Sequence, residues 1–469
     1  MESNGKAENM RQLGKHAGGV LRAALVCGMA IQILLGLAWL IKNTGGLQTF
    51  QESMSLLYGR DGAGLHSGVL YKALAQLSAS RLWILYGIQL AAALTAAYRL
   101  AAVCIGREKR LLCLTAALAL VTIPQAMQCH LAVLPWSLGT SLLMGETALW
   151  LEIREKSFFH GQGKRAAAGY MTAMLCGWGL LLLILPGFAW FVLPLLIAAL
   201  WRLGREKGLR LAAALMAMAL SLGTVTVNCG WNLAEWNRRL AADTLSRVGW
   251  PFLQENYDVI PNPLHDDIGL TTVREVSAYA DSVEQVLIPK LETLYGKERV
   301  TEVLWELTRI CLKENLKPAA KNIIWDMAAY HATPPVLLMQ LRGRAYDAFS
   351  GVNYEQMKNR APVLTKYYVR YGGGWWVVML ALALLIRLCC CLEKTAASKR
   401  TGKKQISEAA RRFAGNWFPV LAGAEWLILS CVFQGSGIMD YKRTLWVTVI
   451  WYLAVLRQLR DREGRAEWQ

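Results

Sequence analysis

The run LWILYGIQLAAALTAAYRLAAVCI, residues 82–105, sets the predicted fold because its only charged residue is Arg99. About 20 predominantly apolar residues suffice to cross the roughly 30 Å hydrocarbon core of a bilayer as a helix. Lipid offers no partner for backbone N–H and C=O groups, so a crossing segment must satisfy them internally. Residues 82–105 are therefore predicted to form a transmembrane α-helix.

Comparable apolar runs recur along the chain and predict about ten spans in all. The fold class is therefore an all-α, polytopic helical membrane protein, with an all-helical extracytoplasmic domain inserted between the seventh and eighth spans. The predicted spans are 20–41, 82–105, 111–127, 133–152, 166–185, 187–201, 211–230, 375–392, 417–434 and 444–458.

The charge distribution orients this bundle. The chain has a formal net charge of +18, and placing the N-terminus in the cytoplasm puts most of the Lys and Arg of the short connections on the cytoplasmic side. The long insert 231–374 has as many acidic as basic residues. We therefore predict a multi-pass protein of the cell membrane with both termini in the cytoplasm. The basic face is expected to contact anionic membrane lipids, and no nucleic acid.

Three parts follow from this topology. Residues 1–230 form an N-terminal membrane bundle of about seven spans with an external loop at 42–81. Residues 231–374 form the extracytoplasmic helical domain, and residues 375–469 contribute about three spans and a basic cytoplasmic tail. Within the insert, helices are predicted at 233–248, 273–295, 298–315, 318–331 and 334–349. The helix at 273–295 is expected to start at a Thr272–Glu275 capping box and to stop at Gly296.

One buried face is predicted in the helix at 298–315. Its apolar residues recur at the three-and-four spacing of an amphipathic helix. They are Val300, Val303, Leu304, Leu307 and Cys311.

The stretch NPLHDDIGL, residues 262–270, raises the possibility of a metal site. Carboxylates suit hard divalent cations, and histidine titrates near physiological pH. A divalent cation held by His265, Asp266 and Asp267 is one interpretation. The alternative, which we favour, is a solvated turn whose aspartates lie just ahead of a helix, where negative charge is stabilised by the helix dipole.

The external loop 42–81 supplies the candidate reaction site. Two amphipathic helices, 51–58 and 68–77, flank a glycine-rich bend and are expected to lie on the outer leaflet. A carboxylate in the bend could act as general base, and basic side chains could hold a phosphate. A plain polar bend between surface helices is the alternative. The candidate catalytic residues are Glu52, Asp61 and His66, and the candidate substrate-binding residues are Arg60 and Lys72.

Several charged residues lie inside predicted spans, where charge is costly and often functional, and three of them are candidates for intramembrane function: Arg99, Glu146 and Glu425. Arg99 in the second span and Glu146 in the fourth lie at similar depth, so we expect them to pair. Glu425, near the middle of the ninth span, has no partner on its own helix and is the stronger indication of function. It would be the ion site in a transporter, the least favoured of three functional hypotheses.

This layout resembles the polytopic glycosyltransferases of the GT-C type. The resemblance covers the topology and the first external loop. Within that loop, Glu52 and Asp61 are the two acidic residues that match the carboxylate of this family. It implies that a first-loop carboxylate acts on the acceptor and that the sugar arrives on a polyprenyl phosphate. The leading hypothesis is thus transfer or polymerisation of lipid-linked glycans at the external face. The alternative is a non-enzymatic scaffold or sensor that binds a partner protein through residues 231–374.

Overall fold

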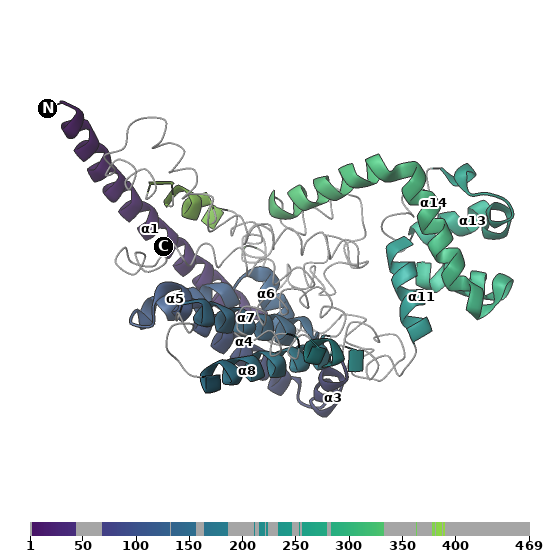
Figure 1. Ribbon diagram of the computed structural model, residues 1–469, viewed down its shortest axis with the longest axis horizontal. Helices are drawn as coiled ribbons and strands as arrows, with labels where there is room; N and C mark the ends of the chain where they lie inside the picture. Colours follow the sequence, from purple (N-terminus) through teal and green to yellow (C-terminus); the bar gives the residue numbers. More distant parts are fainter. Residues whose placement is uncertain are drawn as a thin grey trace.

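The computed structural model is helical throughout the part that it describes, with no strand among these residues (Figure 1). The all-α class predicted from the sequence is confirmed for this part. The described residues are 2–43, 68–131, 133–155, 164–185, 211, 215–220, 222–223, 233–245, 253, 256–278, 283–332, 363, 378–379, 381–386 and 388–389.

Two described helices are long and apolar enough to cross a membrane. One is the apolar part of α1 (Glu2–Asn43), residues His16–Lys42, and the other is α4 (Leu82–Ile105). Both bounds predicted for the helix at 82–105 are confirmed. At 1.5 Å per residue, α4 is about 36 Å long, enough to cross the hydrocarbon core. These helices support membrane association of the chain.

Four more of the described helices belong to the N-terminal bundle: α5 (Arg110–Val121), α6 (Pro124–His130), α7 (Trp136–Glu155) and α8 (Lys164–Ile184). A single helix predicted over 111–127 is wrong, because the chain breaks between α5 and α6. Proline disfavours helical conformation in the residue before it, and Ile123 adopts φ −57°, ψ 133° ahead of Pro124. The break leaves α5 only 12 residues long.

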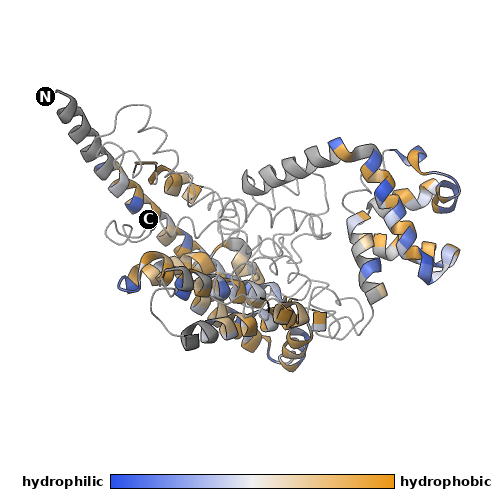
Figure 2. Ribbon diagram, viewed as in Figure 1, coloured by the Kyte–Doolittle hydropathy of each residue, from blue (hydrophilic) through white to orange (hydrophobic). Residues whose placement is uncertain are grey.

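Helix α4 packs against both α5 and α7 in the centre of the bundle. Its fully buried Ala93, Ala97 and Ala101 recur every four residues, and this stripe of small side chains allows close approach of neighbouring helices. The short helix α3 (Val69–Leu77) packs against α8 and α4. Figure 2 shows apolar residues covering the helices of this bundle.

The insert forms a second hydrophobic cluster that shares no residue with the first. It is built from α11 (Leu233–Thr244), the short turn η3 (Tyr257–Val259), α13 (Leu264–Ala278), the π-helical turn η4 (Val283–Leu287) and α14 (Ile288–Ala332). Polar and apolar residues alternate on these helices in Figure 2, as expected for amphipathic elements around a small core.

The predicted buried face of the insert is confirmed: Val300, Val303, Leu304, Leu307 and Cys311 are all buried in this cluster. The predicted helix bounds need correction. Helix α13 starts at Leu264 but is broken at Gly269 (φ 70°, ψ 146°), so its second segment begins close to the predicted start near 273; it ends at Ala278 rather than at 295. Gly296 has a left-handed φ of 75°, which marks the expected interruption, but α14 continues beyond it and passes through Pro318 to Ala332.

The predicted domain boundaries at 230 and 374 and the spans at 187–201, 417–434 and 444–458 lie outside the described residues. The spans at 211–230 and 375–392 are described only in short pieces. Three residues from the second of these pieces, Met379, Ala383 and Ile386, belong to the hydrophobic cluster of the N-terminal bundle.

Candidate functional site

Helix α3 lies near the end of the segment 42–81, predicted to be an external loop, and its N-terminus is fixed to the bundle. The backbone N–H of Gly68 donates to the carbonyl of Ile184 at 2.9 Å, at the C-terminal end of α8. A Cβ on residue 68 would lie 2.0 Å from the carbonyl oxygen of Leu183, so only glycine fits here. The predicted helix at 68–77 is confirmed, and its N-terminus has a defined position.

The two faces of α3 differ in exposure. Val69, Leu70 and Leu77 are exposed, the last by 84%. Tyr71, on the opposite face, is fully buried together with Ala75. Lys72 is half-buried beside it. The outward face of α3 is therefore apolar, as expected for a helix in contact with a lipid leaflet.

A chain of buried hydrogen bonds connects α3 with the bundle interior. The Tyr71 hydroxyl donates to Gln89 Oε1 at 3.0 Å, and Gln89 Nε2 donates to the carbonyl of His130 at 2.8 Å. His130 Nδ1 lies 2.7 Å from Ser137 Oγ. Burial raises the pKa of Tyr71 well above its usual value, so the phenol stays neutral and can serve as the donor. This chain couples α3, α4, α6 and α7.

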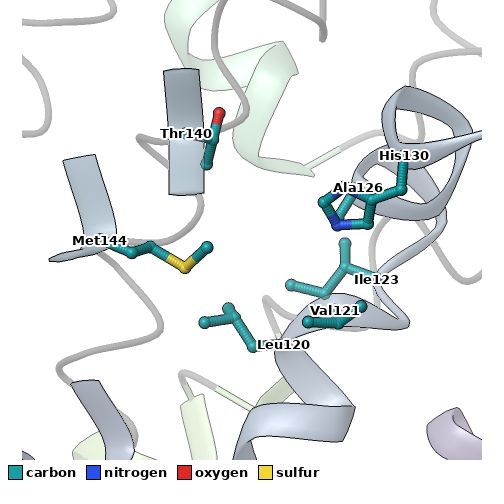
Figure 3. A pocket seen from close by; sticks show the side chains of 7 residues that line it. All are labelled: Leu120, Val121, Ile123, Ala126, His130, Thr140 and Met144. Atoms are coloured by element: carbon teal, nitrogen blue, oxygen red, sulfur yellow. The ribbon is translucent and has the colours of Figure 1, made fainter. Parts of the chain in front are cut away.

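A small cavity adjoins this chain at the break between α5 and α6. His130 and Thr140 are its two polar lining residues, and they reach it from α6 and α7 in Figure 3. Its volume suits a water molecule and no larger ligand. The remaining lining residues are apolar: Leu120, Val121, Ile123, Ala126 and Met144.

Helix α1 covers the same break. Gln32 Nε2 donates to the carbonyl of Ala119 at 2.5 Å, which satisfies one of the acceptors that the end of α5 leaves open. The Thr122 hydroxyl donates to the Leu118 carbonyl at 2.8 Å. A Cβ at Gly36 would lie 2.7 Å from Thr122 Cβ, so α1 crosses the break at a glycine. The interrupted helix is thus stabilised by side chains from its neighbours.

The charged residues of the bundle pair differently from the prediction. Arg99 Nη2 lies 3.2 Å from Glu152 Oε2, and Arg107 Nη2 lies 2.8 Å from Glu152 Oε1. The predicted Arg99–Glu146 ion pair is therefore wrong. The Glu146 carboxylate lies at the crossing of α7 with α8, and its Oε2 is buried without a hydrogen-bond partner among the described residues.

The His265–Asp267 segment forms the first turn of α13. His265 Nδ1 lies 3.0 Å from Asp266 Oδ1, while the Tyr295 hydroxyl donates to Asp267 Oδ2 on the other side of the turn. Within the described ranges, no three His, Cys, Asp or Glu side chains are arranged to hold a metal ion. The geometry therefore gives the metal interpretation no support. The aspartates lie in the first turn of the helix and not ahead of it as predicted. In the first turn their negative charge is stabilised by the helix dipole.

The remaining candidate residues, Glu52, Arg60, Asp61, His66 and Glu425, lie outside the described residues. Sequence reasoning missed Gln89, His130, Ser137 and Glu152. One signal was available: Gln89 is a polar residue inside an otherwise apolar span, and such residues need an internal partner.

Comparison with known proteins gives no match to a family model, to a curated protein or to a solved structure.

Proposed function

We propose that this chain is a multi-pass protein of the cell membrane, with about ten spans and both termini cytoplasmic, that transfers or polymerises lipid-linked glycans at its external face. The substrate class, a sugar on a polyprenyl phosphate, follows from the resemblance to GT-C glycosyltransferases. The charge asymmetry of the sequence and the two long apolar helices support the topology.

The observation that carries the proposal is the position of α3. This helix directly follows the glycine-rich bend of the predicted reaction loop, presents Val69, Leu70 and Leu77 outward, and is anchored to the bundle by Tyr71. A lipid-linked substrate approaches from the leaflet, so an apolar helix at the edge of the bundle suits its hydrocarbon part. In this proposal Lys72, half-buried on the same helix, binds its phosphate.

In this scheme the loop carries out the reaction. Glu52 or Asp61 accepts the proton of the acceptor hydroxyl as that oxygen attacks the anomeric carbon. The bond from that carbon to the phosphate oxygen breaks, and the phosphate leaves with the electron pair. Arg60 and Lys72 stabilise its negative charge, and His66 assists the proton transfer. A divalent cation at the departing phosphate would supply the same stabilisation.

The test uses the purified full chain and a polyprenyl-phosphate-linked sugar carrying a radioactive label. The variant Glu52→Ala/Asp61→Ala is expected to lower transfer by about 10²–10⁴-fold, the usual contribution of a general base. The matched control is Glu298→Ala/Glu302→Ala, which removes two exposed carboxylates of the insert and should leave transfer unchanged. Equal activity of both double variants would refute the catalytic role of the loop.

The second candidate function is a scaffold or sensor that binds a partner protein through the insert. The independent hydrophobic cluster around α11, α13 and α14 favours it, because this lobe has its own core. The two functions separate in cells. If the chain is a scaffold, cells that carry Leu304→Asp, which disrupts that core, should behave like cells that lack the protein. Cells that carry Glu52→Ala/Asp61→Ala should then behave like cells with the unmodified chain.

A further inference from the structure

A compact ion cluster lies at the end of the bundle opposite α3. The Glu152 side chain is only 7% exposed, yet each of its carboxylate oxygens contacts a different arginine. Arg99 comes from α4 and Arg107 from the turn that follows α4. Their side chains remain 48% and 65% exposed. Glu152 therefore holds two guanidinium groups side by side while much of each stays accessible.

The turn that carries Arg107 has a fixed conformation. Gly106 adopts φ 124°, a region that L side chains rarely enter, and this ends α4. Its carbonyl accepts the Lys109 N–H at 3.3 Å and lies 3.3 Å from Cys113 Sγ. A Cβ at residue 106 would lie 2.1 Å from Glu108 Oε1. The backbone that carries Arg107 is thus held in a defined conformation by the hydrogen bonds of its own turn.

Among the side chains that the structure describes, the charge of the cluster is unbalanced. One buried carboxylate cannot neutralise two guanidinium groups, and Lys109 and Arg110 add two more cations against Glu108. Guanidinium groups present planar, paired donors that match phosphate oxygens. Holding them in place beforehand lowers the entropy lost when a ligand is bound.

We propose that Arg99 and Arg107 form a binding site for a phosphate group, supplied by the headgroup of an anionic lipid or by a soluble phosphate. In the proposed topology this end of the bundle faces the cytoplasm, where anionic lipids and basic residues meet. The site is separate from the external loop, so its failure and the failure of the proposed reaction are distinguishable.

The experiment measures the thermal unfolding midpoint of the full chain in phosphatidylcholine nanodiscs. One arm adds phosphatidylglycerol to the bilayer, and another adds inorganic phosphate to the buffer. A rise in the midpoint with either ligand supports the site, and the arm in which it occurs identifies the source. No rise in either arm overturns the proposal.

Two variants separate a built site from diffuse positive charge. Arg107→Gln should weaken binding by about tenfold, the loss expected for a charge-assisted hydrogen bond. The matched control Arg110→Gln removes one exposed cation at the same end of the bundle and should keep most of the effect. Equal losses in the two variants overturn the proposal.

Glu152→Gln gives an independent check, because a built site and diffuse positive charge predict opposite effects of this variant on phosphate binding. It makes the cluster more positive, so diffuse electrostatic attraction would increase. A site that depends on Glu152 to hold both arginines should instead bind the phosphate more weakly. Tighter binding by this variant overturns the proposal.

Discussion

Gly177 of α8 lies directly against the carboxylate of Glu146 on α7: a Cβ at position 177 would be 1.7 Å from Glu146 Oε1. Glu146 Oε2 is buried on the other side of the same group. The carboxylate therefore occupies space that exists only because residue 177 has no side chain.

Gly177→Ala should displace the Glu146 side chain and destabilise the bundle by about 1 kcal/mol, the lower range for overpacking, since a side-chain end can move more easily than backbone. Gly179→Ala is the control, because a Cβ there meets no atom within 4 Å. In the Glu146→Ala/Gly177→Ala double variant the two costs should be less than additive. Thermal unfolding in detergent compares the unmodified chain, Glu146→Ala, Gly177→Ala, the double variant and the Gly179→Ala control, and full additivity would contradict the contact.

The buried hydrogen bonds beneath α3 predict a graded effect. Tyr71→Phe removes one donor and should lower the free energy of unfolding by about 1 kcal/mol. Gln89→Leu leaves both the Tyr71 hydroxyl and the His130 carbonyl without the hydrogen-bond partner that Gln89 supplies, so its cost should be roughly 2–3 kcal/mol. Tyr98 is a partly exposed tyrosine on α4, the helix that carries Gln89, and Tyr98→Phe should change the free energy of unfolding little. An equal effect of Tyr98→Phe and Tyr71→Phe would show that the chain does not stabilise the bundle.

Cys311 allows the core of the insert to be tested by pH. Burial raises the pKa of its thiol to about 12. The folded lobe therefore keeps its proton at a pH where the unfolded chain, with an ordinary thiol pKa of about 8.5, loses it. The contribution of this thiol to the free energy of unfolding is thus fully present below about pH 8.5, and it is lost as the pH rises from there toward 12. Alkylation of Cys311, followed by mass spectrometry, should be slow at pH 8 and become fast in denaturant. Rapid alkylation without denaturant would contradict the buried position.

The sequence predicts elements well where one periodicity dominates. The bounds of α4 and the buried face at Val300–Cys311 follow directly from apolar spacing. The sequence predicts ion-pair partners poorly, because the depth of a residue in the membrane does not specify which side of its helix the side chain lies on. Glu146 and Glu152 are six residues apart on α7 and so point roughly 120° apart around its axis. Arg99 pairs with the second of them. The break before Pro124 was predictable from local backbone chemistry, whereas the burial of Tyr71 depends on the tertiary position of α3.

The proposed topology can be tested with two introduced cysteines on opposite sides. Glu302 is exposed on α14 of the insert, and Arg110 is exposed at the start of α5. A membrane-impermeant maleimide applied to intact cells should label Glu302→Cys at once, because the positive-inside rule places the insert outside. It should label Arg110→Cys only after the cells are permeabilised. The unmodified chain gives the background, to which the buried Cys311 contributes little. The opposite labelling pattern would show that the orientation in the membrane is reversed, with loop 42–81 and the insert in the cytoplasm. The proposed reaction at the external face would then be excluded.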